Sequence, residues 1–308
     1  MWKDWVRPFV RPLPQWSPVG VAPASRLVTA RLRWGDESAD VTADHTVASL
    51  NPLVIATSVD AGERAVLEYR DAATRQLLGT LRLVRDASIA EPQAAPLSFY
   101  RVEAGEHRCL HWPLRAWNAW LQYRSMARHA SSAHLNMDPA AAQQLMIAYL
   151  CPRPVVLVSV EGAGHRNIFP MDLIGPLERS GLYSLALRST NVSEPVMREV
   201  RRVALSHVPA AMKPVVYKLA AHHKQPPRDW AALPFPVRPS KTFGIPTVAG
   251  ALRVQELSIV HSQTIGLHTF FVARVVSTEQ LADGAQLHHT AGFHQVYRRR
   301  RRQPLQDA

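Results

Sequence analysis

Apolar and polar residues alternate along much of the first third of the chain. Residues 27–34 follow a two-residue period, and further apolar runs at 65–69 and 77–84 frame a turn. Alternation of this kind is typical of strands that bury one face. A longer apolar run at 47–59 is divided by an Asn-Pro pair, which indicates two strands joined by a turn. The pattern predicts a β-rich module.

The period changes between about Pro113 and Leu150, where apolar residues recur every three or four positions. This spacing places them on one face of a helix, and the polar stretch 128–138 divides the segment into two helices. Asp138 before Pro139 favours a helix start, because the carboxylate accepts hydrogen bonds from the first amides and proline fits the first helical position.

Strand-like runs return in the C-terminal half. The runs at 155–160, 182–187, 251–260 and 269–276 are apolar and rich in β-branched residues. Residues 192–203 predict a short helix between them, since a Glu-Pro pair opens the segment and valines recur on one face. No βαβ rhythm repeats, so the fold class indicated is mainly β, or α+β.

The composition is that of a folded protein, because 47% of the 308 residues are hydrophobic and 19% are charged. Nowhere do enough apolar residues run together to span a membrane, and the N-terminus lacks a signal-peptide stretch. Cys109 and Cys151 lack the spacing of a disulfide framework or a zinc site. We therefore expect a cytoplasmic protein with reduced thiols.

The net charge of +12 comes from 36 basic and 24 acidic residues, and five of the basic residues are the consecutive Arg298–Arg302. The other basic residues are scattered and form no stripe of the kind that binds nucleic acid. We expect the arginine run to be an extended, solvated tail outside the folded body. A second interpretation is that this tail contacts a polyanion, either nucleic acid or an anionic membrane.

Familiar catalytic motifs are absent. A buried strand runs into Gly162 and Gly164, but Asn167 replaces the third glycine of a dinucleotide-binding loop, and prolines follow where its helix would begin. The chain also has no Walker loop, no Gly-x-Ser-x-Gly elbow and no His-Glu-x-x-His motif. These absences exclude the most recognisable nucleotide-binding and hydrolytic sites.

Histidines are numerous, with fourteen in the chain. His288, His289 and His294 fall within one short segment, but no carboxylate or cysteine motif stands beside them, so we do not expect a metal site. His222 and His223 lie in a lysine-rich connector and are predicted to be solvated.

One polar turn has the chemistry to bind a phosphate. Arg188-Ser189-Thr190-Asn191 directly follows a predicted strand. A phosphate dianion is bound by hydroxyl groups, amide groups and a cation, and this turn offers all three. The other interpretation is an ordinary polar turn, and the sequence leaves both open.

Three segments of the C-terminal half occur in a familiar order. Residues 154–159 read Pro-Val-Val-Leu-Val-Ser and lead through a turn to Gly164-His-Arg-Asn167. Gly266-Leu-His268 opens a later strand, and residues 287–293 read Leu-His-His-Thr-Ala-Gly-Phe. Over about residues 150–298, these segments resemble the flavin reductase-like family of FMN-binding split-barrel domains. In the second segment Leu267 replaces the aspartate of the family's Gly-Asp-His motif.

The N-terminal half resembles the same family over residues 41–54, which are similar to its Thr-Ala-x-x-x-x-Ser-Val-Ser-Leu-x-Pro-Pro-Leu-Val segment. This implies two related barrel modules. Because nothing in 85–112 resembles the Gly-x-His strand, we expect the first module to be truncated or degenerate. A short internal similarity between 51–64 and 153–166 fits duplication and convergence equally well.

The resemblance implies a split β-barrel of the flavin reductase type in the C-terminal half. The chain would then divide into an N-terminal extension with a β-rich module (1–112), a helical connector (113–150) and the split barrel with its arginine-rich tail (151–308). Flavin lies at a homodimer interface in this family. The resemblance therefore implies either a homodimer or an intramolecular pseudo-dimer.

The resemblance also implies a reaction, in which NADH or NADPH reduces FMN, with FAD as the second choice of flavin. A flavin-dependent reduction of an unknown acceptor is a variant of the same function. The alternative is a non-enzymatic or cofactor-free interaction protein on the same barrel. The implied catalytic residue is His268, and the implied cofactor-binding residues are Asn167, Phe169, Met171, Asp172, Ile174, Arg188, Ser189, Thr190 and Asn191, with the flavin ring facing the backbone of 169–174.

Overall fold

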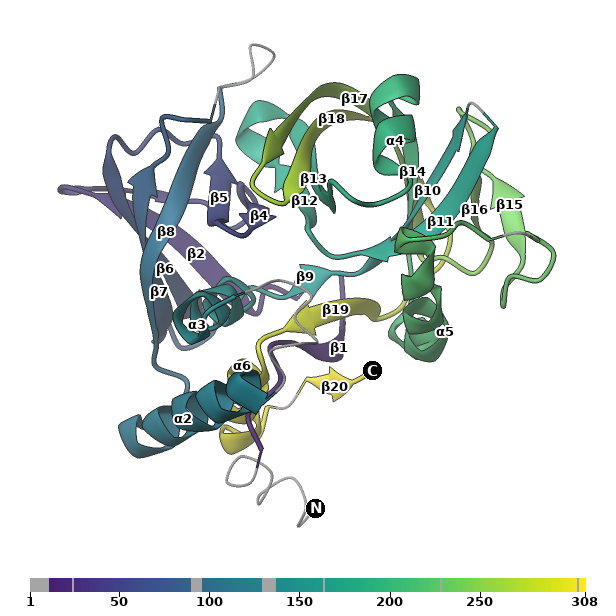
Figure 1. Ribbon diagram of the computed structural model, residues 1–308. Helices are drawn as coiled ribbons and strands as arrows, with labels where there is room; N and C mark the ends of the chain where they lie inside the picture. Colours follow the sequence, from purple (N-terminus) through teal and green to yellow (C-terminus); the bar gives the residue numbers. More distant parts are fainter. Residues whose placement is uncertain are drawn as a thin grey trace.

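Two seven-stranded antiparallel sheets, one from each half of the chain, form most of the fold (Figure 1). The computed structural model describes residues 11–23, 25–89, 96–128, 137–162, 164–227, 229–303 and 305–308. We call the first sheet, with its connections, module 1 and the second module 2. The strands of module 1 are β2 (Val28–Trp34), β3 (Glu37–Asp40), β4 (His45–Leu50), β5 (Leu53–Thr57), β6 (Arg64–Asp71), β7 (Leu77–Arg85) and β8 (Ser98–His107).

Module 2 is built in the same way from the C-terminal half. Its strands are β10 (Val156–Gly162), β11 (His165–Met171), β12 (Ile174–Leu177), β13 (Leu182–Arg188), β14 (Arg202–His207), β17 (Arg253–Ile265) and β18 (His268–Gln280). The strand order is β3-β2-β6-β7-β8-β5-β4 in module 1 and β11-β10-β14-β17-β18-β13-β12 in module 2. When the strands of each sheet are numbered in chain order, both read 2-1-5-6-7-4-3.

This shared order corrects one expectation from the sequence and decides between two alternatives that the sequence left open. Module 1 is not truncated, because β8 occupies the place that β18 has in module 2. Residues 85–112 therefore lack the Gly-x-His motif but not the strand. The short similarity between 51–64 and 153–166 does not reflect the repeat, since the first segment contains the fourth strand of its sheet and the second contains the first strand.

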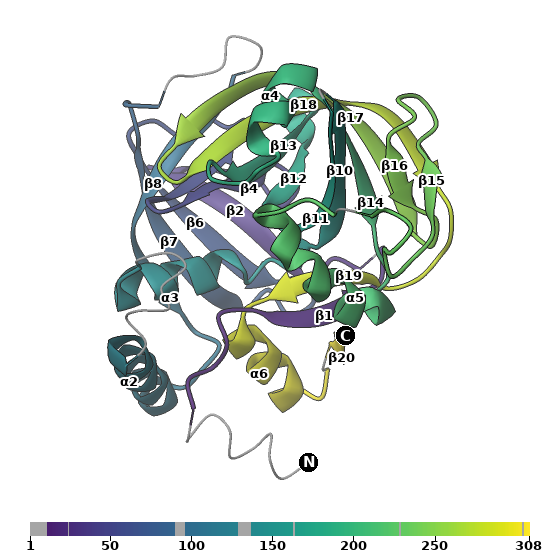
Figure 2. The same cartoon turned by 45° about the vertical axis from the view of Figure 1, so that its right-hand side comes forward.

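A smaller sheet ties the chain ends to the link between the modules. It contains β1 (Ser17–Val21), β9 (Arg153–Pro154), β19 (Gln286–Thr290) and β20 (Gln306–Asp307) in the order β20-β1-β19-β9. The strands that precede the two modules, β1 and β9, thus flank β19 on opposite sides (Figure 1). Figure 2 shows β1, β19 and β20 below the module 2 sheet. A two-stranded sheet of β15 (Val237–Pro239) and β16 (Pro246–Val248) completes the strands.

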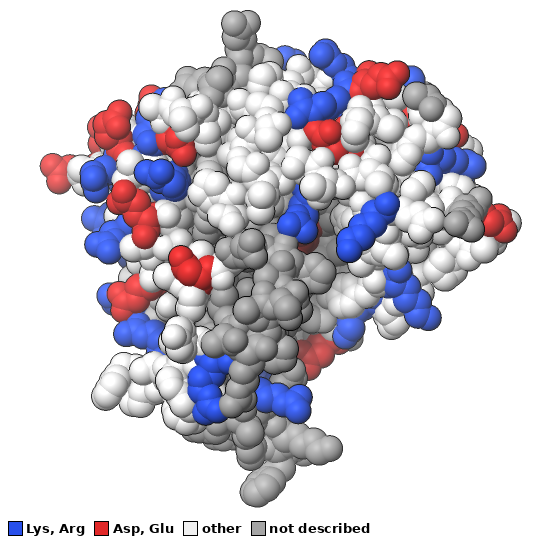
Figure 3. Space-filling view, viewed as in Figure 1, with Lys and Arg blue, Asp and Glu red and all other residues white. Residues whose placement is uncertain are grey.

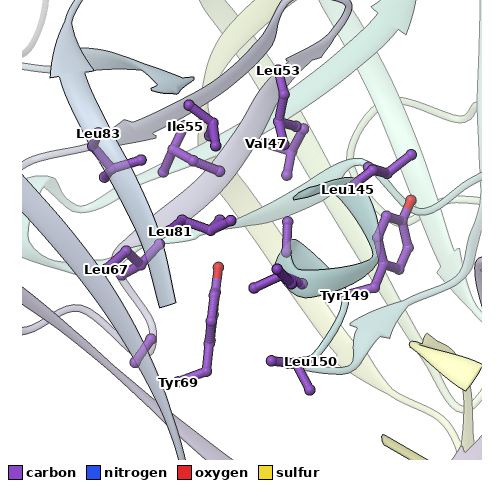
Figure 4. Close-up of a cluster of buried hydrophobic side chains, with 14 of the residues drawn as sticks. Val47, Leu53, Ile55, Leu67, Tyr69, Leu81, Leu83, Leu145, Tyr149 and Leu150 are labelled. Atoms are coloured by element: carbon purple, nitrogen blue, oxygen red, sulfur yellow. The ribbon is translucent and has the colours of Figure 1, made fainter. Parts of the chain in front are cut away.

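The two helices predicted between the modules are confirmed as α2 (Trp112–Arg128) and α3 (Pro139–Ala148). Asp138 caps α3, since its Oδ1 accepts a hydrogen bond from the backbone N of Ala141 at 2.7 Å. Leu145, Tyr149 and Leu150 belong to the same buried cluster as Leu67, Tyr69 and Leu81 of the module 1 sheet, and Figure 4 shows side chains of this cluster. The other helices are α4 (Glu194–Val200), α5 (Lys213–Lys218) and α6 (Gly292–Arg300), with 3-10 turns η2 (Glu178–Ser180), η3 (Ala210–Met212) and η4 (Leu219–His223).

Within the described ranges, no helix combines the length and the apolar character needed to cross a membrane.

One hydrophobic core extends from module 1 into module 2. The buried cluster around Leu67 and Phe99 also contains Leu177 and Phe270 of module 2. Phe99 and Phe270 meet edge to face, with ring centroids 5.5 Å apart. Because burial of apolar surface is the main stabilising term in folding, this shared core stabilises both modules.

The arginine run is not the solvated tail that its charge predicts. Arg298–Arg300 form the last turn of α6, where cations interact favourably with the helix dipole. The buried Tyr297 anchors this turn, and only 13% of the Arg298 side chain is exposed, 4.0 Å from the carboxylate of Asp71. Arg299 pairs with Asp307 at 2.7 Å. Contact with a polyanion stays a prediction for the exposed arginines that follow.

Deleting residues 298–308 should therefore destabilise the protein. The deletion removes β20 and the buried Leu305, which packs with Val19 and Val21 of β1. Loss of one buried leucine typically costs about 2 to 5 kcal/mol. Thermal unfolding of the truncated chain should show a lower Tm, while Arg300→Ala, at an exposed position of the same helix, should leave Tm nearly unchanged. Equal Tm values for the deleted and full chains would restore the expectation of a free tail.

Candidate functional site

The structure brings together two predicted site residues that lie far apart in the sequence. Arg188 ends β13, His268 begins β18, and these residues are paired across the two antiparallel strands. The turn after Arg188 is fixed to the turn before His268, because the backbone N and the Oγ of Ser189 donate to the carbonyl of Leu267 at 3.1 and 3.2 Å. Arg188, Ser189 and Thr190 are exposed. A cation and two hydroxyl groups therefore share one solvent-facing turn.

Asn191 shapes this turn. Its Oδ1 accepts a hydrogen bond from the backbone N of Ser193 at 2.8 Å, and its Nδ2 lies 2.6 Å from Nδ1 of His223. Only 3% of Asn191 is exposed. The side chain thus connects the turn to η4 and presents little surface to a ligand.

Asn167 is fully buried, and its amide hydrogens are both used within the protein. Nδ2 donates to Oγ of Ser193 and to the carbonyl of His222, each at 2.8 Å, while Oδ1 accepts from the backbone N of Ile168. An amide NH₂ group has only two hydrogens to donate. The side chain therefore holds β11 against η4, and a contact with flavin would need its backbone.

The predicted ring-facing segment has its apolar side chains turned inward. Phe169, Met171 and Ile174 are buried in the core of module 2. A contact between this segment and a flavin ring would therefore use its backbone. The contact itself stays a prediction.

Asp172 lies at the centre of a hydrogen-bond network that the sequence did not indicate. Its Oδ2 accepts from the hydroxyl of Tyr149 at 2.9 Å and lies 2.7 Å from Nδ1 of His289. Nε2 of His289 lies 2.8 Å from the hydroxyl of Tyr217. Trp16 stacks on both Tyr149 and His289, with ring centroids 5.9 Å apart in each case. His289 thus connects Asp172 on one side of its ring to Tyr217 on the other.

These contacts set the charges around the site. Burial alone would raise the pKa of Asp172, but hydrogen bonds from His289 and Tyr149 and the charge of Arg153 outweigh it and hold this pKa below its usual range. Burial, with Arg188 nearby, lowers the pKa of His268 to about 4. At neutral pH, His268 is therefore neutral and Asp172 is an anion, and Arg188 is the cation on the exposed turn.

His222 and His223 are not solvated as the sequence predicted. Nδ1 of His222 lies 2.7 Å from the carbonyl of Ile168, and the ring of His223 packs on Phe169 with centroids 5.2 Å apart. Burial lowers the pKa of His223. The lysines around these residues indicated an exposed connector, but the two histidines join η4 to β11.

Module 1 closes the other side of His268. Nδ1 of His268 lies 3.4 Å from Oγ of Ser49 and accepts from the backbone N of Leu50 at 3.5 Å. The backbone N of Leu267 donates to the carbonyl of Asn51 at 3.2 Å. A Cβ on Gly266 would lie 2.3 Å from that carbonyl oxygen, and the φ of this residue is +54°, so only glycine fits the junction. His268 is 1% exposed, and its contact with nicotinamide stays a prediction.

The histidines considered as metal ligands have partners within the protein. Nδ1 of His288 lies 3.0 Å from the carbonyl of Gln286, and Nδ1 of His294 lies 2.8 Å from the hydroxyl of Thr290. In the part of the chain that the structure describes, no three His, Cys, Asp or Glu side chains group as a metal site.

Figure 3 shows basic side chains spread over the viewed face in small groups, with acidic ones among them.

Comparison with known proteins places this arrangement in a family. A family model described as flavin reductase like domain matches residues 148–303, slightly more than half of the chain. This chain belongs to the flavin reductase-like family. The matched residues include Asp172, Arg188 and His268, and module 1 lies outside them. The fold is the split barrel predicted from the sequence.

Several solved structures are similar to this flavin reductase-like chain. An FMN-binding protein from Thermus thermophilus is 25% identical over 42% of this chain and 72% of its own, with a TM-score of 0.37. An NADH:FAD oxidoreductase of Streptomyces globisporus is 22% identical over 52% of this chain and 94% of its own, with a TM-score of 0.43. The flavin reductase component of a bacterial two-component tryptophan halogenase is 21% identical over 48% and 91%, with a TM-score of 0.42. Comparison with curated proteins gives no significant match.

Proposed function

We propose that this chain is an oxidoreductase that binds FMN in module 2 and reduces it with NADH or NADPH. The observation that carries the proposal is the exposed turn at Arg188, where a guanidinium group and the hydroxyls of Ser189 and Thr190 lie beside the His268 strand. Membership of the flavin reductase-like family supports the same assignment. The unpaired thiols of Cys109 and Cys151 suit the reducing cytoplasm in which nicotinamide nucleotides act.

The residues present fit the phosphate end of a flavin. An arginine binds phosphate through two parallel N–H groups, and the hydroxyl of Thr190 adds a further donor, while the hydroxyl of Ser189 already donates to the carbonyl of Leu267. FMN, with its single terminal phosphate, matches one such turn, and FAD is the second choice. Bound flavin would supply the redox chemistry, so the protein needs only to bind, orient and shield the reacting groups. The absence of an obvious acid–base pair on the turn is consistent with that role.

A spectrum of the purified protein tests the proposal most directly. Protein mixed with FMN and then desalted should retain the absorption of oxidised flavin. Addition of NADH or NADPH under anaerobic conditions should bleach this absorption. A colourless protein that leaves the fluorescence of added FMN and FAD unchanged would favour the cofactor-free interaction protein instead.

Replacing Arg188 by alanine should weaken FMN binding by about 1.5 to 3 kcal/mol, the typical contribution of a hydrogen bond to a charged group. This corresponds to roughly a 10- to 150-fold rise in Kd, which fluorescence titration would measure. Arg274→Ala is a matched control, because Arg274 is an exposed arginine on β18. Equal affinities for Arg188→Ala and the unmodified protein would remove Arg188 from the site.

A further inference from the structure

The two modules repeat the same strand order, so each site position in module 2 has a counterpart in module 1. Arg188 and His268 end the fourth strand and begin the seventh strand of module 2, where they are paired. At the corresponding strand ends of module 1, Thr57 is paired with Ser98. The cation and the imidazole of the proposed flavin site are thus replaced by two small hydroxyl side chains.

A carboxylate of the chain itself occupies the donors that follow Thr57. Oδ1 of Asp44 accepts from Oγ of Ser58 at 3.0 Å, and Oδ2 accepts from the backbone N of Ser58 at 3.2 Å. Oδ2 also lies 3.4 Å from Oγ1 of Thr57. Asp44 is only 2% exposed. The groups that would bind a phosphate in module 1 are therefore already bonded to an anion, which would repel a second one.

Module 2 covers this carboxylate from the other side. The backbone N of Arg179 donates to Oδ1 of Asp44 at 3.1 Å, and Nε of Arg179 lies 3.9 Å from Oδ2. Arg179 is the nearby cation, and it faces the buried carboxylate. Of these two corresponding turns, the one at Arg188 is open to a phosphate and the one after Thr57 is closed by Asp44.

Module 1 also contributes to the open site. The contacts of Ser49, Leu50 and Asn51 with the turn at Gly266–His268 come from the β4–β5 end of module 1. This end packs against β12, β13 and β18, and the cores of the two modules are continuous. A second copy of the chain cannot reach these strands, because module 1 already covers them.

We propose that module 1 replaces a partner subunit, so that each chain is an internal pseudo-dimer with a single flavin site in module 2. This inference rests on the proposed flavin function for the nature of the ligand. The pairing of the two modules is a property of the fold, so this part of the inference does not depend on the proposed function.

Calorimetric titration with FMN and light scattering test the proposal together. We expect one FMN bound per chain and the mass of a monomer. In Arg188→Ala, every FMN site should have a lower affinity than in the unmodified protein. Ser58→Ala, at the corresponding turn of module 1, should leave the affinity unchanged. Two FMN per chain, or a set of sites in Arg188→Ala that keeps the original affinity, would overturn the single-site assignment.

The mass measurement separates a failure of this inference from a failure of the proposed function. A monomer that binds neither FMN nor FAD would overturn the proposed function and leave module 1 in the place of a partner. A homodimer in solution, or one FMN bound per two chains, would overturn the internal pseudo-dimer.

Discussion

The free energy of unfolding should fall steeply as the pH is lowered from 7 to 5, because the fold buries several neutral histidines. Burial is the largest cause in each case, and it lowers the pKa of His45, His107 and His268 to about 4 and that of His207 and His294 to about 3. An unfolded histidine has a pKa of about 6.5. The unfolded chain therefore binds more protons than the folded chain below pH 6.5, and stability is lost as the pH falls through this window.

The size of the effect follows from the difference between the pKa values. At pH 5, each of these histidines favours the unfolded state by about 2 kcal/mol, since 1.5 pH units correspond to roughly that amount. Five such groups sum to about 10 kcal/mol, which is comparable with the entire stability of a typical protein. We expect the protein to unfold near pH 5. Urea unfolding followed by circular dichroism between pH 7.5 and 5 would measure the slope.

A substitution of His107 would measure how much one of these histidines contributes to the pH dependence of stability. Its ring stacks on Phe293 with centroids 3.9 Å apart and an interplanar angle of 1°. Among the described residues, the buried Nδ1 of His107 has no hydrogen-bond partner. His107→Phe should keep the stacking, remove the titration and reduce the pH dependence of stability by up to one proton. The exposed His111 is the control, because His111→Gln should leave the slope unchanged. An unchanged slope in His107→Phe would show that this histidine binds protons equally in the folded and unfolded states.

Local signals in the sequence were enough to predict most of the secondary structure. Alternation at 27–34 and apolar runs at 155–160 and 182–187 correspond to β2, β10 and β13, because a strand must bury one or both faces wherever it lies. Asp138 and Pro139 mark the start of α3 through hydrogen bonds that involve only neighbouring residues. Such features depend on short stretches of chain, so the sequence shows them directly.

The failed predictions depend on contacts between distant residues. The five consecutive arginines suggested a free tail, but Phe293 and Tyr297 anchor the helix that carries them. The lysines around His223 suggested solvent exposure, although its partners, Asn191 and Phe169, come from other elements. No local pattern marks a side chain whose partners lie dozens of residues away. The chemistry of a polar turn identified Arg188 and the resemblance to a family identified His268, but only the fold showed that they are neighbours.

The network around Asp172 is the clearest case of such long-range assembly. Tyr149 follows α3, Asp172 lies between β11 and β12, His289 is on β19, and Tyr217 is on α5. Asp172 was predicted from the family resemblance as a flavin-binding residue. In the structure, its Oδ2 accepts from Tyr149 and lies at hydrogen-bond distance from His289, so its first role is to connect these elements.

Replacing Asp172 by alanine should therefore destabilise the protein by about 3 to 5 kcal/mol, because it removes the acceptor of two hydrogen bonds to a carboxylate and leaves the buried Tyr149 hydroxyl without this partner. Asp172→Asn keeps an oxygen in the same place, so we expect it to lose only about 1 to 2 kcal/mol, the part that depends on charge. Chemical unfolding at pH 7.5 would measure both values.

The comparison between these two variants decides what Asp172 does. Since Oδ2 is committed to protein partners, Asp172→Asn should bind FMN nearly as well as the unmodified protein under conditions where both are folded. Equal losses of stability in the alanine and asparagine variants would mean that the negative charge, and not the shared acceptor, holds Tyr149 and His289 in place. A large loss of FMN affinity in Asp172→Asn, without a matching loss of stability, would instead place this carboxylate against the flavin, as the resemblance to the family predicts.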